Sequence, residues 1–192
     1  MHTPKCFLCS ESGLTLISNL PADWTVHVSF KPFKTCSGWL TKLNDCFAQK
    51  GFQLATLESA DGRRIYIVNT HLDAGRSELD RQARSSQLNQ IAHTLEAEAG
   101  NDAVLVAGDL NLDWASLQDN ELLQNFVQRL NLVLAQKGGD ASNDWTTLDY
   151  VYYRSSEKTS LTLGSAGEDA EFTADGRPLS DHPALFTNFI IR

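Results

Sequence analysis

The sequence predicts one α/β domain in which mixed strands and helices build a layered sandwich. Two long segments carry apolar residues at helical spacing, and several shorter ones carry the apolar patterns of strands. Some strand segments follow one another directly, which favours a sandwich over a strict alternation of strands and helices. The 192 residues contain no internal repeat, low-complexity tract or linker, so residues 1–192 are expected to form a single domain.

The first half of the chain is predicted to contain a buried strand and a hairpin. "GLTLIS" at residues 13–18 has the apolar content of a buried strand, whereas residues 31–50 have the composition of a loop. "FQLATLES" (52–59) and "RRIYIVNTH" (63–71) alternate as strands, and "ADG" between them is typical of a hairpin turn.

The second half is predicted to hold two helices and four strands. Residues 78–99 carry a helical apolar stripe that Gly100 ends, and residues 117–130 carry a second one. Predicted strands are "AVLVAG" (103–108), "LVLA" (132–135), "TLDYVYYR" (147–154) and "PALFTNFIIR" (183–192), and "DGRP" (175–178) is predicted to be a turn.

The composition disfavours a non-specific polyanion binder and a protein that spans a membrane. Sixteen basic and 24 acidic side chains give a net charge of -8, which disfavours tight non-specific binding to a polyanion because phosphate contacts dominate such affinity. No run of 18 or more apolar residues is present, so the sequence predicts no transmembrane segment. The first ten residues also lack the apolar stretch of a signal peptide.

Polar side chains cluster at the ends of four predicted strands. Ligands of α/β sheets gather where strand ends meet loops, and carboxylate and amide oxygens suit Mg²⁺ or Mn²⁺. Each cluster alone is explained by turn or loop chemistry, but their joint occurrence predicts a catalytic site. The candidate residues are His71, Asp109, Asn111, Asp149, Asp181 and His182.

Four motifs occur in the order seen in a known superfamily. With "NTHLDAG", "GDLNLD", "LDYVYYR" and "SDHPAL", the chain from about Gly13 to its end resembles the endonuclease/exonuclease/phosphatase superfamily. The segments "KGFQLATL" and "RSSQLNQI" lie where that superfamily has similar stretches. Within it, "THLDAG" and the loop from the cysteines to "KGF" look most like bacterial sphingomyelinase-type phosphodiesterases.

The resemblance implies a four-layer αββα sandwich that hydrolyses phosphodiesters with Mg²⁺ or Mn²⁺. Carried over by motif, His71 would contact the phosphate or protonate the leaving oxygen. Asp109 and Asn111 would orient the attacking water and the phosphate, or hold a metal ion, and Asp149 would support the phosphate-side network.

The motif "SDHP" implies the remaining roles. His182 would act as a base or phosphate ligand, and Asp181 would fix its tautomer and raise its basicity. The implied metal ligands present in this sequence are Asp109, Asn111 and His182.

The sequence departs from the superfamily at its start. Superfamily members begin with a strand bearing an Asn, a helix, and a strand ending in the Glu that is the principal metal ligand. Neither Glu11 nor Glu58 matches that Glu. We therefore expect a sandwich that is incomplete at its N-terminus, without its first strand–helix–strand unit, and weak binding of Mg²⁺ by the ligands that remain.

The four cysteines leave several pairings open on spacing alone. "CFLC" places Cys6 and Cys9 at metal or redox spacing, but zinc would need a second tight pair, and Cys36 and Cys46 are ten residues apart. Free thiols in a cytosolic protein and a disulfide in an exported one are both compatible with this pattern. Because relatives with such a loop are often exported, the resemblance implies a Cys36–Cys46 bridge and an extracellular or periplasmic protein.

Three functions follow from these expectations. The first is a divalent-metal-dependent, sphingomyelinase-like phosphodiesterase that acts on a phospholipid head group, with peripheral contact to a membrane, and that is impaired by the absence of the metal-binding Glu. The second is a DNase-like endonuclease acting on nucleic acid, against which the net charge of -8 counts. The third is a catalytically inactive fold kept as a binding or inert domain. The sequence does not distinguish the substrates or indicate an oligomeric state.

Overall fold

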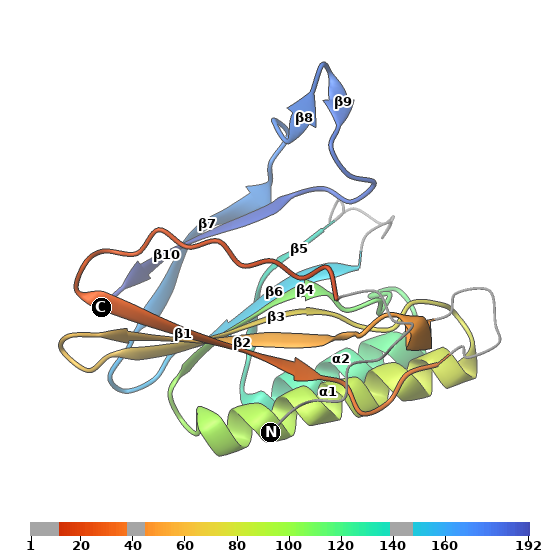
Figure 1. Cartoon of the computed structure of the whole chain (residues 1–192), viewed down its shortest axis with the longest axis horizontal. Helices are drawn as coiled ribbons and strands as arrows, with labels where there is room; N and C mark the ends of the chain where they lie inside the picture. Colours follow the sequence, from red (N-terminus) through yellow and green to blue (C-terminus); the bar gives the residue numbers. More distant parts are fainter. Residues whose placement is uncertain (1–11, 38–44, 139–147) are drawn as a thin grey trace.

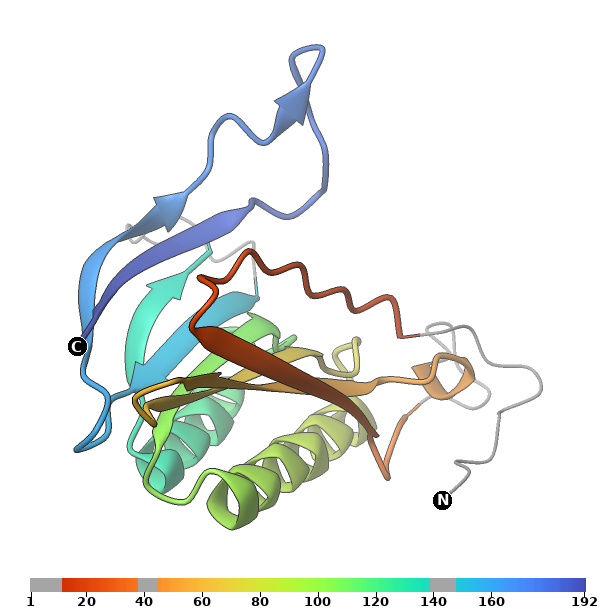
Figure 2. The same cartoon turned by 60° about the vertical axis from the view of Figure 1, so that its left-hand side comes forward.

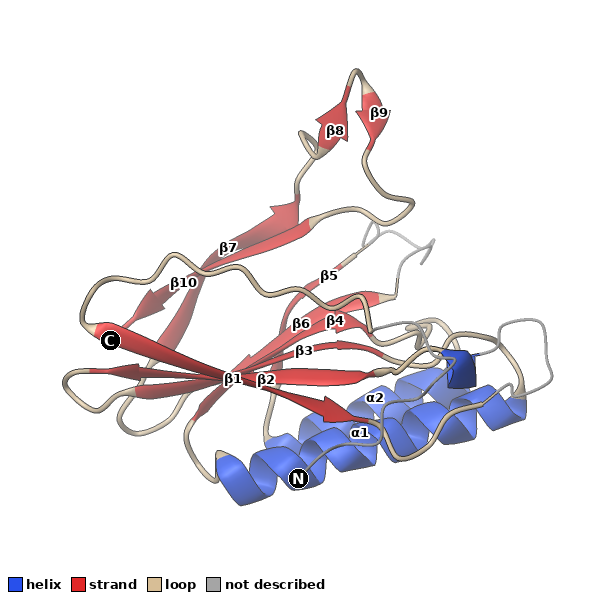
Figure 3. Cartoon of the chain, in the orientation of Figure 1, coloured by secondary structure: helices blue, strands red, loops and turns tan. Residues whose placement is uncertain are grey.

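Two helices, a six-stranded sheet and a two-stranded sheet form successive layers of the molecule. The computed structural model describes residues 12–37, 45–138 and 148–192. Both helices lie on one side of the larger sheet, and the smaller sheet lies on the other side (Figures 1 and 3). This arrangement is an α/β sandwich, as the sequence predicts.

The larger sheet has the strand order β1-β2-β3-β4-β6-β5, in which only the β3–β4 pair is parallel. The hairpin of β2 and β3 confirms the sequence prediction, and β4 to β6 also form where strands are predicted. The strand bounds are Trp24–Pro32 (β1), Gly51–Ser59 (β2), Arg64–His71 (β3), Ala103–Asp109 (β4), Val133–Lys137 (β5) and Asp149–Arg154 (β6).

The two predicted helices form close to their predicted bounds. Helix α1 (Glu78–Glu98) begins with a capping box in which Ser77 and Asp80 bond to each other's backbone, and it ends just before Gly100. Helix α2 (Leu117–Leu130) begins after Ser116, whose side chain accepts from the backbone of Asp119. Neither helix is long and apolar enough to cross a membrane.

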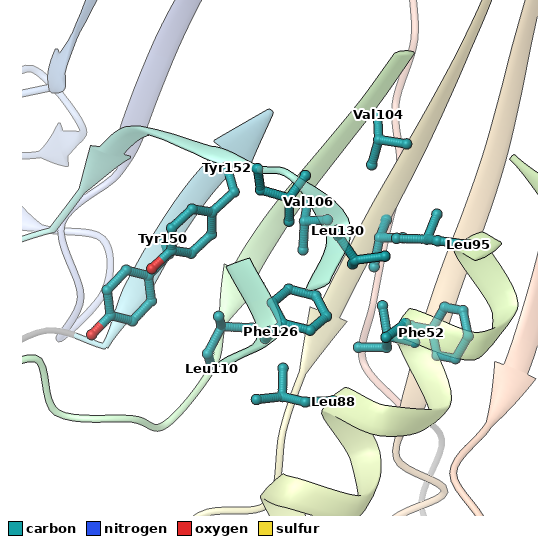
Figure 4. Packing of buried hydrophobic residues seen from close by; sticks show 14 of the residues in the cluster. Phe52, Leu88, Leu95, Val104, Val106, Leu110, Phe126, Leu130, Tyr150 and Tyr152 are labelled. Carbon is teal, nitrogen blue, oxygen red and sulfur yellow. The ribbon is translucent and has the colours of Figure 1, made fainter. Parts of the chain in front are cut away.

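The main hydrophobic core lies between the two helices and the larger sheet (Figure 4). Successive side chains of a strand point to opposite faces, so every second residue of β2, β3 and β4 faces the helices. Buried members from these strands include Phe52, Leu54, Val68, Val104 and Val106. The intervening residues face the other way, where Ile65, Ala103 and Leu161 form a second, smaller cluster.

The smaller sheet pairs β7 (Leu161–Glu168) with the C-terminal strand β10 (Leu185–Ile191). Both strands contact β5, and Figure 2 shows this pair alongside that end of the larger sheet. A hairpin of β8 (Thr173–Ala174) and β9 (Arg177–Pro178) projects away from the body, with the predicted "DGRP" turn at its tip. Within the described parts of the chain no helix covers the smaller sheet, so three of the four expected layers are present.

One predicted strand is wrong, and two long strands, β1 and β7, are absent from the sequence prediction. Residues 13–18 form no strand, because their carbonyls accept bonds from the side chains of Gln53 and Asn69 rather than from a neighbouring strand. Strand β1 instead occupies the edge beside β2. Its Val26, Val28 and Phe30 point to the face away from the helices and remain partly exposed to solvent.

A disulfide joins Cys36 to Cys46, with 5.3 Å between their Cα atoms, which confirms the predicted pairing. It ties the chain after β1 to the short 3-10 helix at Asp45–Phe47 that precedes β2. The predicted alternatives for Cys6 and Cys9 lie outside the described residues, as does Glu11.

Gly108 allows β3 and β4 to pair at full length. It has a φ of +141°, and a Cβ atom placed there would lie 1.9 Å from the carbonyl oxygen of Thr70, its register partner on β3. Any side chain would therefore push the two strands apart at the end where His71 and Asp109 are paired.

We expect Gly108→Ala to lower the free energy of unfolding by about 3 kcal/mol or more, because backbone strain adds to a clash with the β3 backbone. Gly62→Ala is the control: it also has a positive φ, +83°, but nothing lies within 4 Å of its added Cβ. It should cost only about 1–2 kcal/mol. Urea unfolding of both variants measures this, and equal losses would contradict the role assigned to Gly108.

Removing the disulfide should lower the free energy of unfolding, because the unfolded chain gains conformational freedom. For residues ten apart in sequence, the lost constraint amounts to about 2–3 kcal/mol. Urea unfolding of Cys36→Ser/Cys46→Ser against the oxidised protein measures the difference. Dithiothreitol should reproduce most of the loss in the parent and add little to the variant; a parent indifferent to reduction would count against the bridge.

Candidate active site

The ends of three neighbouring strands bring three of the predicted residues together. His71 ends β3, Asp109 ends β4 and Asp149 begins β6. His71 is paired with Asp109 in the sheet register, and Asp109 is paired with Asp149. Because register partners point to the same face, all three side chains project from the face away from the helices.

Asp109 lies beside His71. The Nε2 atom of His71 is 3.5 Å from Oδ2 of Asp109, and their side chains are 46% and 15% exposed. Burial lowers the pKa of His71, and the charge of Lys50 lowers it further, against the opposing effect of Asp109. His71 is therefore a neutral imidazole at pH 7 that can donate one hydrogen bond and accept another.

Asp149 holds the second histidine. Nδ1 of His182 lies 2.6 Å from Oδ2 of Asp149, and this hydrogen bond raises the pKa of His182. Burial raises the pKa of Asp149 in spite of the same bond. The hydrogen-bond partner of His182 is thus Asp149 and not Asp181, which is exposed and accepts a bond from Ser180.

Asn111 lies in the turn after β4. Its backbone N–H donates to Oδ1 of Asp109 over 2.8 Å, and its φ of 50° is in the left-handed region that Asn tolerates. Its side-chain amide donates to the carbonyl of Leu72, 3.1 Å away, in the loop after β3. The turn therefore joins the ends of β3 and β4 through one side chain.

Two carboxylates and one imidazole lie close enough to share a cation. Asp109, Asp149 and His182 each offer one ligand atom, and these atoms lie within 4.8 Å of one another. Of the ligands expected from the sequence, Asp109 and His182 are in this group, and Asn111 is bonded to Asp109. Asp149, expected only to support the phosphate, is the third member.

A buried polar network behind the site was not predicted from the sequence. Lys50 forms an ion pair of 2.9 Å with Asp45, and its ammonium also donates to the carbonyl of Leu72. Both oxygens of Asp73 accept bonds: one from the backbone and hydroxyl of Ser37, and the other from the amide of Gln87. Three segments that resemble the superfamily contain members of this network: "KGF" contains Lys50, "THLDAG" contains Asp73 and "RSSQLNQI" contains Gln87.

Two cavities lie near opposite ends of strands β4 and β6. One of about 310 Å³, lined in part by Asp181, His182 and Phe172, lies beside the projecting hairpin. A larger one of about 700 Å³ lies near Arg154 and Lys158, at the opposite ends of β4 and β6 from Asp109 and Asp149.

Comparison with known proteins identifies the family of this chain. The model of Endonuclease/Exonuclease/phosphatase family 2 matches residues 19–161. A sphingomyelinase of Mycobacterium tuberculosis (strain ATCC 25618 / H37Rv) is 26% identical over 161 residues, covering 76% of this chain and 32% of that protein. Sphingomyelinase C of Leptospira interrogans is 29% identical over 119 residues, covering 59% and 20%. The chain thus spans a third or less of these relatives.

Solved structures share the fold. An endonuclease/exonuclease/phosphatase from Bacteroides vulgatus has a TM-score of 0.62 at 17% identity, covering 88% of this chain and 67% of the other. Sphingomyelinase C from Streptomyces griseocarneus has a TM-score of 0.52 at 19% identity, covering 88% and 64%. With the family model matching most of its length, the chain belongs to Endonuclease/Exonuclease/phosphatase family 2.

Proposed function

We propose that this chain carries the catalytic site of a divalent-metal-dependent phosphodiester hydrolase, with a phospholipid head group of the sphingomyelin type as its substrate. The observation that carries the proposal is the alignment of His71, Asp109 and Asp149 across three strands, with His182 bonded to Asp149. The similarity to proteins named sphingomyelinase supports this choice of substrate.

The residues of the site fit a divalent cation. Asp109 and Asp149 are carboxylates, and hard cations such as Mg²⁺ or Mn²⁺ prefer oxygen ligands. These two carboxylates would hold the ion, and Asn111, in the turn beside Asp109, would offer an amide oxygen. When bound, the cation would offset the charge that develops on the phosphate oxygens during hydrolysis.

His182 is suited to accept the proton of the attacking water. Its bond to Asp149 fixes which nitrogen carries the hydrogen and stabilises the imidazolium that forms. The raised pKa of His182 has the same cause, so the dyad is a stronger base than a free histidine.

His71 is suited to hold the phosphate. As a neutral imidazole beside Asp109, it can donate an N–H to a phosphate oxygen without adding a second positive charge next to His182. The pKa of His71 is lowered and that of His182 is raised. We therefore assign phosphate binding to His71 and proton transfer to His182.

The proposed location is extracellular or periplasmic. A disulfide between Cys36 and Cys46 persists in oxidising compartments and is rare in the cytosol. Peripheral contact with a lipid surface is part of the proposal, because the substrate would lie in a membrane.

Hydrolysis of sphingomyelin and of bis-p-nitrophenyl phosphate, with Mg²⁺ and with excess chelator, tests the proposal. Activity is expected only with the ion, and Asp109→Asn should lower kcat by more than about 100-fold, because it removes a charge that acts directly on the reacting group. Asp113→Asn is a matched control, since Asp113 caps the turn at Ala115 and forms no part of the described cluster. It should change kcat little.

Plasmid DNA is the third substrate in the same assay. Cleavage of DNA in preference to sphingomyelin would replace the lipid substrate by a nucleic acid. Wild-type protein that hydrolyses none of the three at millimolar Mg²⁺ or Mn²⁺ would leave the inactive, binding fold as the function.

Asp149→Asn should lower the pKa of His182 toward its ordinary value, because the carboxylate that stabilises the imidazolium is lost. Asp181→Asn is the control and should shift that pKa much less, since Asp181 acts on His182 only through its charge. NMR titration of the imidazole C–H signals in metal-free protein measures both. A larger shift from Asp181→Asn would restore the role that the sequence suggested for it.

A further inference from the structure

We propose that Lys50 is a positioning residue of this site, which holds the Leu72 carbonyl so that this carbonyl can orient the amide of Asn111. Among the described residues, the Lys50 ammonium bonds to the carbonyl of Leu72 and the carboxylate of Asp45, and to neither histidine. The inference rests on the proposed function, because Asn111 needs a fixed orientation only if its amide serves a ligand or substrate.

Leu72 connects three parts of the site through its peptide groups. Its carbonyl oxygen accepts from Nζ of Lys50 at 2.6 Å and from Nδ2 of Asn111 at 3.1 Å, which uses both lone pairs of that oxygen. Its N–H donates to the carbonyl of Asp109 over 2.9 Å. The residue after His71 is therefore fixed from both sides, and its position sets those of Asn111 and Asp109.

Lys50 is itself held in one place. Its side chain is 11% exposed and its partner Asp45 is 8% exposed, so the pair lies largely out of water. Asp45 also accepts from the backbone N–H of Ala74, two residues beyond Leu72. On the other side, the neighbouring Cys46 is bonded to Cys36. A lysine loses much rotamer entropy when ordered, and these contacts are what offset that loss.

The orientation of Asn111 follows from this arrangement. One N–H of the Asn111 amide is bonded to Leu72, and this bond fixes the direction in which the amide oxygen points. An oxygen is the atom that a hard cation or a water donor requires. Without Lys50 the Leu72 peptide would lose its charge-assisted bond, and Asn111 would lose the fixed acceptor that sets its orientation.

The alternative to a positioning role is that the Lys50–Asp45 ion pair only stabilises the loop between β1 and β2. Replacing Lys50 alone would leave Asp45 buried without its partner, and the variant could unfold for that reason. The test variant is therefore Lys50→Gln/Asp45→Asn, which removes both charges and leaves two amides that can bond to each other. Lys31→Gln/Glu98→Gln is the control, because it removes another lysine–carboxylate pair, between β1 and α1, in the same way.

The first readout needs neither metal nor substrate. In NMR spectra of metal-free protein, the side-chain NH₂ signals of Asn111, assigned by their absence from Asn111→Ala, should move in the test variant and stay in place in the control. Backbone amides of β2 and β3 report whether each variant is folded. In wild type, the Lys50 ammonium protons should exchange more slowly with water than those of the exposed Lys158.

The second readout is activity with Mg²⁺. The test variant should lose about 10–100-fold in kcat with KM unchanged, as for partners that orient a ligand. The control should keep wild-type kcat. A folded test variant with unmoved Asn111 signals, or a Lys50 ammonium that exchanges as fast as that of Lys158, would overturn the proposal. If wild-type protein hydrolyses nothing, the proposed function fails, while the NMR signals still decide the role of Lys50.

Discussion

The register of β3, β4 and β6 is the constraint on which the candidate site depends. One line of paired residues runs from His71 through Asp109 to Asp149, and it exists because Gly108 lets two backbones approach without a side chain between them. A shift of one residue in any of these strands would turn a site side chain into the hydrophobic core. The same alternation places the core on one face and the chemistry at the end of the other.

Placing two carboxylates on adjacent strands has an electrostatic cost. The charge of Asp109 contributes to the raised pKa of Asp149, although burial is the larger cause. At Asp149 the hydrogen bond with His182 offsets part of this cost. An imidazole can give up its proton near neutral pH, so the carboxylates stay open to a cation in a way that a permanent ion pair would prevent.

Local sequence patterns predicted most of the fold but not all of it. The hairpin and both helices have strong periodicity and clear end signals, so their positions follow from the chain alone. Strand β7 was not predicted because its Gly, Ser and Ala residues have little preference for strands, and it forms by pairing with β10. Residues 13–18 have the apolar pattern of a strand, yet no strand of the described residues pairs with them.

In the site, too, contacts between residues close in sequence could be predicted, and contacts between distant residues could not. Asp109 and Asn111 belong to one turn, and their motif could be recognised in the sequence. The partner of His182 could not, because Asp149 is 33 residues away in sequence, whereas Asp181 is adjacent and was the natural choice. Lys50 was missed for the same reason, since its bond to Leu72 spans 22 residues.

The partly exposed apolar row of β1 has a consequence for colloidal behaviour. Val26, Val28 and Phe30 lie on β1, the edge strand of the larger sheet as far as the structure describes the chain, and an edge strand can recruit a strand from another molecule. Mutual repulsion from a net charge of -8 keeps copies apart at neutral pH. That repulsion vanishes near the isoelectric point of about 5.0, so mildly acidic buffers are the conditions in which this edge would seed precipitation.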